Sequence, residues 1–576
     1  MGAPGASRDQ AALLLRAVAA GLVAGASALL LRAVITWLPR LVWPAATDLV
    51  QAVALAPTAW RIAVPVAGAL IAGGILSLGA RWSGTARGWD VLEAVVLRDG
   101  VLPIRSTLVR AASAVVTQAA AAPVGREGPI VLLAATAAST LGQRLGLQPR
   151  QMRVMAGCGV AAGLACAYNA PIGAALFTVE ILFGSFAIDV FAPLVISAVT
   201  ATLLTWSTFG RAPVFAVPSL ALASPWELLP HAALGVLGGA VAALFLLALR
   251  AAAALYARSR LPRPLAMASA ALVVGVLTIW FPEVVGNGQL AIAALFQRPW
   301  TLGAVASLLV VRLIVTPLTV GSGAVGGVFT PTLFIGAMLG YAFGGVTAAV
   351  LPGAHSDPGV YALVGMACVL AGTTHAPLMA TMMVFEMTLD YNAVVPLLLG
   401  SAIAALVASR VSRTSVYTEA IERKAAAHDD AASRAVSALR VADLLRTEQI
   451  TVPAACPAPQ LVDIFVRVRR NHLYVVDGDT RFLGAVNLHD LNSALRDLGH
   501  PDALTAGAIM QARFEAVFPD ERIPATLARF ERQECERLPV LADSRSRRLI
   551  GTLSKRDILS AYAREQLAQT PRGPDA

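Results

Sequence analysis

The chain has 576 residues, of which 57% are apolar and only 14% charged, and its mean hydropathy is +0.68. Soluble proteins carry about a quarter charged residues, so this composition excludes an ordinary soluble protein and indicates a membrane protein. The net charge of +10 comes without a basic cluster interleaved with aromatic residues, which argues against a nucleic-acid partner and favours anionic membrane lipid headgroups.

The first apolar stretch, residues 11–31, is longer than the roughly 7 to 15 residues of a cleaved signal's hydrophobic region. We interpret it as a retained membrane helix with a cytoplasmic N-terminus. Further apolar segments lie at 62–78, 106–124, 130–141, 155–183, 191–205, 232–255, 265–280, 302–320, 332–350, 361–387 and 394–411. Some are shorter than the ~20 residues that cross a bilayer and others are too long for one span, which predicts tilted and broken helices.

Residues 125–129, with the sequence GREGP, place an Arg and a Glu between two apolar runs. Charges at membrane depth are costly, so this stretch is a candidate functional site. The flanking glycines and Pro129 predict a helix N-terminus, where free amides and the helix dipole favour anions. Arg126 would add positive potential and Glu127 could sit there as a tethered anion. The alternative is an interfacial loop with a solvated ion pair.

An internal repeat relates two parts of the apolar region. The Leu-Ala pair at 164–165 recurs at 370–371, the Ala-Pro pair at 170–171 recurs at 376–377, and Glu180 recurs as Glu386, all 206 residues apart. Each copy follows a Gly-rich element that ends in proline, at 125–129 and at 321–331. Related halves of this kind often have inverted topology and hold the substrate between them.

These motifs resemble the CLC family of chloride channels and proton-coupled chloride transporters. The resemblance rests on residues 125–129, on 327–331 (GVFTP) and on the Ala-Pro repeats, and it covers about residues 10–424. Residues 321–336, 373–377 and 385–388 are similar to the bacterial ClcB-type branch. The resemblance implies an all-α polytopic membrane fold, an inverted repeat of broken, tilted helices, assembled as a homodimer with one anion pathway per subunit.

The resemblance also assigns residues by position. Glu127 matches the family's gating glutamate, whose carboxylate occupies the outer anion position and leaves when protonated. Arg126 and the amide of Gly128 would flank that position. Two further elements complete the predicted anion site: the amides of Val328 and Phe329 at its centre, and the hydroxyl of Tyr417 on the inner side.

The chain departs from the family pattern at two places. Where the family often has a serine on the central anion, residues 88–93 read GWDVLE, so anion preference stays open between chloride and another anion such as fluoride or nitrate. Where exchangers often have a second, inner glutamate, this chain has Ile181, which cannot relay a proton. This difference favours a channel over a chloride/proton antiporter, which remains the alternative.

Other polar residues in the apolar region are interpreted as structural. Glu180 and Glu386 are expected to hold helices together, and His375 to be a satisfied structural histidine rather than a metal ligand. Asp90 and Glu93 could form another inner proton route, although a solvated helix start is the default. The sequence shows no nucleophile-base pair, phosphate-cradling loop or metal cluster, so we expect neither an enzyme nor a required cofactor.

The composition changes after Val411. Basic residues end the membrane part, predicted as 1–424 with repeat halves at about 10–205 and 232–424, on the cytoplasmic side. After a linker at 425–438, the chain resembles a tandem pair of α/β cystathionine-beta-synthase (CBS) domains at 439–500 and 502–566, followed by a disordered tail at 567–576.

CBS pairs often bind adenine nucleotides through a Ser/Thr-x-x-Asp pattern. Ser554 and Asp557 fit this pattern in the second copy, while Asn487 departs from it in the first. A nucleotide in the second copy and a regulatory module without ligand both remain open.

Taken together, the sequence predicts a dimeric chloride channel of the cytoplasmic (inner) membrane, gated by protonation of Glu127 and fitted with cytosolic CBS domains. A cation transporter would instead require acidic residues lining the apolar domain, whereas the Gly-rich helix starts and Arg126 favour anions.

Overall fold

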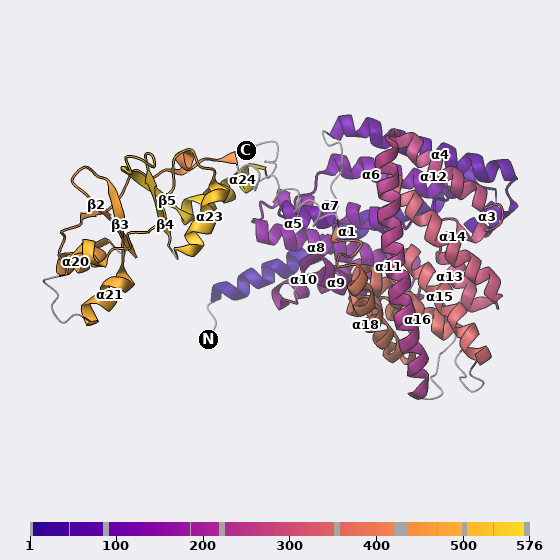
Figure 1. The fold of residues 1–576 in the computed structure, drawn as a ribbon. Helices are drawn as coiled ribbons and strands as arrows, with labels where there is room; N and C mark the ends of the chain where they lie inside the picture. Colours follow the sequence, from indigo (N-terminus) through magenta and orange to yellow (C-terminus); the bar gives the residue numbers. More distant parts are fainter. Residues whose placement is uncertain are drawn as a thin grey trace. The chain divides into compact units, whose positions relative to one another are not determined.

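The computed structural model describes residues 4–44, 46–83, 91–184, 186–217, 225–350, 357–419, 436, 438–468, 471–497, 504–533 and 535–569. The chain divides into two compact units, Met1–Ile421 and Glu422–Ala576. The first is helical and the second is α/β, so the predicted order of an all-α region followed by an α/β region is confirmed (Figure 1).

Helices make up the described part of the first unit. Their bounds are α1 Pro4–Trp37, α2 Pro39–Val42, α3 Leu49–Leu55, α4 Thr58–Ser83, α5 Val91–Leu97, α6 Ile104–Ala119, α7 Glu127–Arg144, α8 Pro149–Tyr168, α9 Pro171–Phe177, α10 Ile188–Phe209, α11 Leu228–Ser259, α12 Arg263–Leu277, α13 Gln289–Gln297, α14 Leu302–Gly321, α15 Phe329–Val350, α16 Pro358–Thr374, α17 Pro377–Thr388 and α18 Val394–Val411. Among the described residues, seven helices are long and apolar enough to cross a membrane.

The apolar segments at 155–183 and 361–387, which are too long for one membrane span, are each broken at an Ala-Pro pair of the repeat. Helix α8 ends at Asn169 and α16 ends at His375, both in the left-handed region at φ 56° and φ 57°. Pro171 and Pro377 then start α9 and α17, because proline lacks the amide hydrogen that a first helical turn does not need. Thr178–Phe183 continues α9 as a π-helix. The predicted broken helices are therefore confirmed.

The helices of the two halves pack in corresponding pairs. Helix α8 packs on α7 and α10, and α16 packs in the same way on α15 and α18. The halves also meet each other through α4 with α12 and α9 with α17; in Figure 1, α4 and α12 lie side by side. The internal repeat in the sequence is thus a repeat of packing as well.

Carboxylates fasten each half to the other. Glu386 in α17 accepts hydrogen bonds from the amides of Ile172 (3.0 Å) and Gly173 (2.7 Å) at the start of α9. Glu180 accepts one from the amide of Met379 (2.9 Å) at the start of α17. All three bonds satisfy amides that a helix N-terminus leaves without intrahelical partners. The structure therefore gives both glutamates the structural role expected from the sequence.

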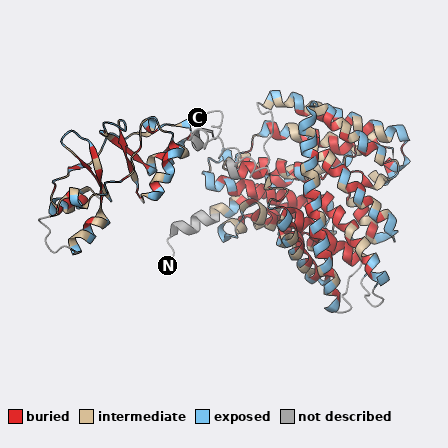
Figure 2. Cartoon of the chain, viewed as in Figure 1, coloured by how far each residue is buried: buried red, intermediate tan, exposed pale blue. Residues whose placement is uncertain are grey.

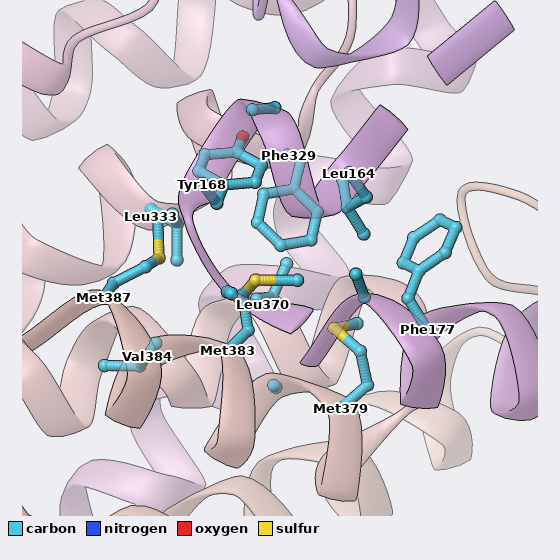
Figure 3. Packing of buried hydrophobic residues seen from close by; sticks show 14 of the residues in the cluster. Leu164, Tyr168, Phe177, Phe329, Leu333, Leu370, Met379, Met383, Val384 and Met387 are labelled. Carbon is cyan, nitrogen blue, oxygen red and sulfur yellow. The ribbon is translucent and has the colours of Figure 1, made fainter. Parts of the chain in front are cut away.

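Buried residues run through the interior of the first unit, and the largest cluster of them includes residues of α8, α9, α15, α16 and α17 (Figure 2). Phe329 at the start of α15 and Tyr168 at the end of α8 lie beside each other there, with Phe177 of α9 further along (Figure 3). Methionines of α17, such as Met379 and Met383, fill the space below them. This core fixes the ends of the broken helices, which carry the candidate site.

The second unit contains two small sheets. Strands β1 Thr451–Pro453, β2 His472–Val476 and β3 Phe482–Asn487 form one sheet, in which β1 is parallel and β3 antiparallel to β2. The other pairs β4 Arg537–Leu541 with β5 Leu549–Ser554 in antiparallel fashion. Helices complete this unit: α20 Ala458–Val468, α21 Leu488–Asp497, α22 Ala506–Ile509, α23 Ile523–Arg532 and α24 Lys555–Gln569.

The sequence predicts strands at 473–477, 483–487, 538–543 and 549–554 and helices at 490–498 and 557–564 in this unit. Strands β2 to β5 and helices α21 and α24 lie within a few residues of these places, whereas β1, α20, α22 and α23 had not been predicted. Most of the predicted linker and residues 570–576 of the predicted tail lie outside the described residues.

Replacing Glu386 should destabilise the membrane unit. Glu386→Ala leaves the Ile172 and Gly173 amides without their carboxylate, and a hydrogen bond to a charged group contributes about 1.5–3 kcal/mol. We expect a lower thermal unfolding temperature in detergent, measured by intrinsic fluorescence. Glu386→Gln keeps one acceptor oxygen and should lie between Ala and wild type. Unfolding of the alanine variant at the wild-type temperature would contradict this role.

Candidate functional site

Two helix N-termini, those of α7 and α15, meet at the centre of the membrane unit. Just before the helices, Gly125 and Gly327 form an antiparallel bridge in which each amide donates to the other's carbonyl, at 2.6 and 2.8 Å. A β-carbon at either glycine would overlap the carboxylate of Glu127. Glycine at both positions therefore leaves room for the Glu127 carboxylate where it lies in this structure, and the bridge joins the two helix starts.

The Glu127 carboxylate lies on the N-terminus of α15. Its Oε1 accepts from the amides of Phe329 (2.9 Å) and Thr330 (3.3 Å), and its Oε2 accepts from the Thr330 hydroxyl (3.1 Å). The side chain of Glu127 is buried, at 3% exposure. A helix N-terminus favours negative charge, so the carboxylate lies where the local structure stabilises an anionic group.

The other predicted site residues surround this contact. Among the described residues, Phe329 and Thr330 donate hydrogen bonds to the Glu127 carboxylate, whereas Gly128 and Val328 do not. Gly128 instead packs against the backbone of Gly327, and the Val328 carbonyl accepts from the Thr332 amide (2.9 Å). The structure thus brings Glu127 and Phe329 into direct contact and places Gly128 and Val328 beside it.

Arg126 faces a large outer cavity of about 740 Å³. Its Nη2 donates to Gln289 Oε1 (2.7 Å) at the start of α13. Arg32 and Arg40 also line this cavity, whereas its acidic lining among the described residues is Asp48. The excess of guanidinium groups gives the cavity a positive potential, which attracts anions towards the buried carboxylate.

A small cavity of about 70 Å³ lies on the other side of Glu127. Gly128, Phe177 and Tyr417 line it, and so does Ile181. The rings of Phe177 and Tyr417 meet edge to face, with centroids 5.3 Å apart. Glu127 and Tyr417 therefore line the same small cavity, and the role of Tyr417 at an anion site stays a prediction.

Sequence reasoning missed Arg32, Thr330, Tyr168 and Arg312. Arg32 donates to the carbonyl of Cys166 (2.6 Å) and stacks on Phe209, 4.3 Å from its centroid. Its sequence signal was a basic residue at the end of a long apolar run. Thr330 belongs to the 327–331 motif, in which the sequence predicted a role only for the amides of Val328 and Phe329.

Arg312 is fully buried in α14. It donates to the carbonyls of Val284 (2.5 Å) and Gly286 (2.9 Å), and its guanidinium lies over the Phe334 ring, 5.0 Å from the centroid. This side chain holds the segment that leads into α13 and therefore into the Gln289 contact with Arg126. A lone arginine in an apolar helix was the available sequence signal.

Two further predictions are modified by the structure. Glu93 is 4% exposed, so the expectation of a solvated helix start is wrong for this residue, and Asp90 lies outside the described residues. His375 ends α16 through its backbone, in the position that Asn169 holds in the other half. Its Nε2 has no hydrogen-bond partner among the described residues, so the histidine is structural without being fully satisfied.

In the second unit, the predicted nucleotide residues are engaged elsewhere. Asp557 forms a two-point ion pair with Arg446 (3.0 and 2.8 Å), and Ser554 is 5% exposed. A cavity of about 320 Å³ lies in this unit and is lined by Glu448, Gln449, Ile450, Asn471, His472, Tyr474, Glu536, Arg537 and Thr552. Neither predicted residue lines it, and its two glutamates would repel phosphate groups. Because Arg537 also lines this cavity, its charge is mixed, and a ribose contact at Ser554 and Asp557 stays a prediction.

Comparisons with known proteins relate both units to established families. The family model described as "Voltage gated chloride channel" matches residues 67–409, and the CBS domain model matches residues 441–497 and 506–564. A ClcB-like chloride channel protein of Ralstonia nicotianae is 43% identical over 66% of this chain and 90% of its own length. A voltage-gated ClC-type chloride channel ClcB of Citrobacter koseri is 36% identical over 62% of this chain and 86% of its own length.

Among solved structures, a slow cyanobacterial Cl⁻/H⁺ antiporter has a similar fold, with a TM-score of 0.63 and 24% identity. The similarity covers 72% of this chain and 98% of that one. These findings agree with the resemblance and with the placement of two α/β repeats after the helical unit.

The Arg446–Asp557 pair should make the stability of the second unit depend on acid pH. Hydrogen bonding from Arg446 lowers the pKa of Asp557 below its ordinary value of 3.8. A carboxylate with a depressed folded-state pKa stabilises the fold above its ordinary pKa and loses that contribution as the pH falls through the folded-state value. Because Arg446 is exposed, solvent screening keeps this contribution small.

Asp557→Asn should accordingly speed hydrogen exchange in β5 and α24 of the intact chain at pH 7, relative to wild type. The difference should shrink once the pH is brought well below 3.8. Arg446→Gln removes the same pair and serves as the matched variant. An equal difference at both pH values would show that the effect is not electrostatic.

Proposed function

Because the chain belongs to the voltage-gated chloride channel (CLC) family, we propose that it carries chloride across a membrane and that Glu127 is its gate. The observation that carries the proposal is the buried Glu127 carboxylate on the amides of Phe329 and Thr330, with its hydrogen-bond donors arranged as for a bound anion. A carboxylate in that position closes the passage, since it fills the place that a chloride ion would need.

Gating follows from the charge of the carboxylate. When Glu127 is ionised, the helix N-terminus and the Thr330 hydroxyl stabilise it in place. Protonation removes the charge that these donors stabilise, so the side chain can leave and a chloride ion can bind instead. The donors are neutral, and anion binding without a full positive charge is weak enough to allow release, which conduction requires.

The two cavities supply the approaches to this site. Arg32, Arg40 and Arg126 in the outer cavity would concentrate chloride near Glu127. Phe177 and Tyr417 would narrow the inner side. A cation transporter fits this lining poorly, because among the described lining residues of the outer cavity three arginines face a single aspartate.

Channel activity is our first choice and chloride/proton antiport the alternative. Ile181 in the inner cavity cannot relay protons, which favours a channel. The alternative has two supports: the similar fold of a Cl⁻/H⁺ antiporter, and buried Glu93 in the helix that also carries the cavity residues Val91 and Leu92. Selectivity for fluoride or nitrate remains a further alternative, because the sequence lacks the expected serine near residues 88–93.

We further propose a homodimer in the cytoplasmic (inner) membrane with the CBS pair in the cytoplasm. Basic residues at the end of the apolar region, such as Arg413, support that orientation. An adenine nucleotide at the CBS pair stays a prediction, and the engagement of Asp557 by Arg446 favours a regulatory module that works without one.

Removing the gate should increase chloride flux. In proteoliposomes, Glu127→Ala is expected to pass chloride faster than wild type at neutral pH and to lose the pH dependence, because no carboxylate competes for the site. Glu127→Gln should resemble the protonated state. Asp189→Ala, which removes an exposed carboxylate of α10, is the control and should behave as wild type. Transport of cations and not anions by the wild-type protein would refute the proposed function.

Opposing chloride and proton gradients should distinguish the two transport modes. For a channel, the reversal potential lies at the chloride Nernst potential and does not move when the proton gradient is changed. An antiporter displaces it with the proton gradient. We expect a reversal potential at the chloride Nernst potential. If the reversal potential instead moves with the proton gradient, we expect Glu93→Gln to change proton movement.

A further inference from the structure

Two buried hydroxyl groups extend the hydrogen bonds of Glu127 into the core. The Thr330 hydroxyl lies 3.1 Å from Glu127 Oε2, and the Tyr168 hydroxyl lies 2.6 Å from Thr330 Oγ1. Thr330 is 1% exposed and Tyr168 is 2% exposed. The three side chains come from α15, α8 and α7, so the tertiary structure alone brings them together.

The hydrogen bonds that link Tyr168, Thr330 and Glu127 all donate towards the carboxylate. An ionised carboxylate can only accept, so the Thr330 hydroxyl must donate its single hydrogen to Glu127. Thr330 Oγ1 can then only accept from Tyr168, whose hydroxyl is the donor. Successive hydrogen bonds polarise each other, so Tyr168 makes the Thr330 hydroxyl a better donor to an anion.

Tyr168 is held independently of the carboxylate. It occupies the last turn of α8, and its ring lies 4.9 Å from the Phe329 ring between centroids (Figure 3). Its hydroxyl would therefore stay in place if Glu127 moved away. The Thr330 hydroxyl would keep its orientation for the same reason, next to the two amides that Glu127 had vacated.

We propose that the Thr330 hydroxyl is a direct ligand of the transported anion and that Tyr168 positions it. This inference rests on the proposed function, because it concerns the anion that replaces Glu127. The hydroxyl would join the Phe329 and Thr330 amides as a third donor. It adds a hydroxyl ligand from α15 at the position that Glu127 vacates, which is distinct from the central position where the sequence lacks a serine near residues 88–93.

The test measures chloride binding with the gate removed. Chloride affinity is determined by calorimetry on the purified full-length protein in detergent, in a Glu127→Ala background. Adding Thr330→Val, which keeps the branched shape and removes the hydroxyl, should weaken chloride binding about tenfold, as expected for the loss of a hydrogen bond to a charged group. Adding Thr330→Ser instead should restore most of the affinity.

Tyr168→Phe in the same background keeps the ring on Phe329 and removes only the hydroxyl. We expect a smaller loss, roughly threefold, since Thr330 would still donate but without polarisation. This variant also keeps the test decisive if Thr330→Val fails to fold, as judged by size-exclusion chromatography.

The outcomes separate this inference from the proposed function. If Glu127→Ala binds chloride and neither Thr330→Val nor Tyr168→Phe weakens it, the hydroxyl chain is not a ligand, while the proposed function stands. If Glu127→Ala binds no chloride and the wild type moves none, both fail. A loss that Thr330→Ser does not recover would mean that threonine acts through packing, and that result also overturns the inference.

Discussion

The structure depends on placing one carboxylate against one helix N-terminus in the interior of a membrane protein. An ionised carboxylate is costly to bury unless hydrogen-bond donors replace water around it. Glu127 receives those donors from Phe329 and Thr330, which belong to the other half of the chain. The same donors can stabilise a free anion, so the arrangement that makes Glu127 tolerable also makes the position an anion site.

The internal repeat explains how the backbone around this site is held in place. Glu180 and Glu386 each bond to the first turn of a short helix in the opposite half, so both halves are fastened around the centre. Gly125 and Gly327 join the halves at the site itself. These contacts hold the scaffold, and Glu127 would differ from Glu180 and Glu386 in the proposed function because an anion from solution takes its place.

Positive charge is placed near the site without occupying it. Arg126 bonds to Gln289, Arg32 to the Cys166 carbonyl, and Arg312 to the carbonyls of Val284 and Gly286. Among the described residues, each of these guanidinium groups donates to uncharged acceptors and is not paired with a carboxylate. In the proposed function an anion would be attracted by these charges and bound by neutral donors, which is compatible with rapid release.

Sequence alone determined the class of the protein, because composition and long apolar segments report directly on a membrane environment. The constant 206-residue register of the repeat and the GREGP motif also led to the family, and Ala-Pro marked the helix breaks at 170–171 and 376–377. The tertiary structure decided which groups touch. Thr330 and Tyr168 are 162 residues apart, and no local sequence pattern predicts the hydrogen bond between them. Glu93 is buried, although its polar side chain had been expected to face solvent. Hydrogen bonds and burial depend on helices from different parts of the chain, so no stretch of sequence contains them.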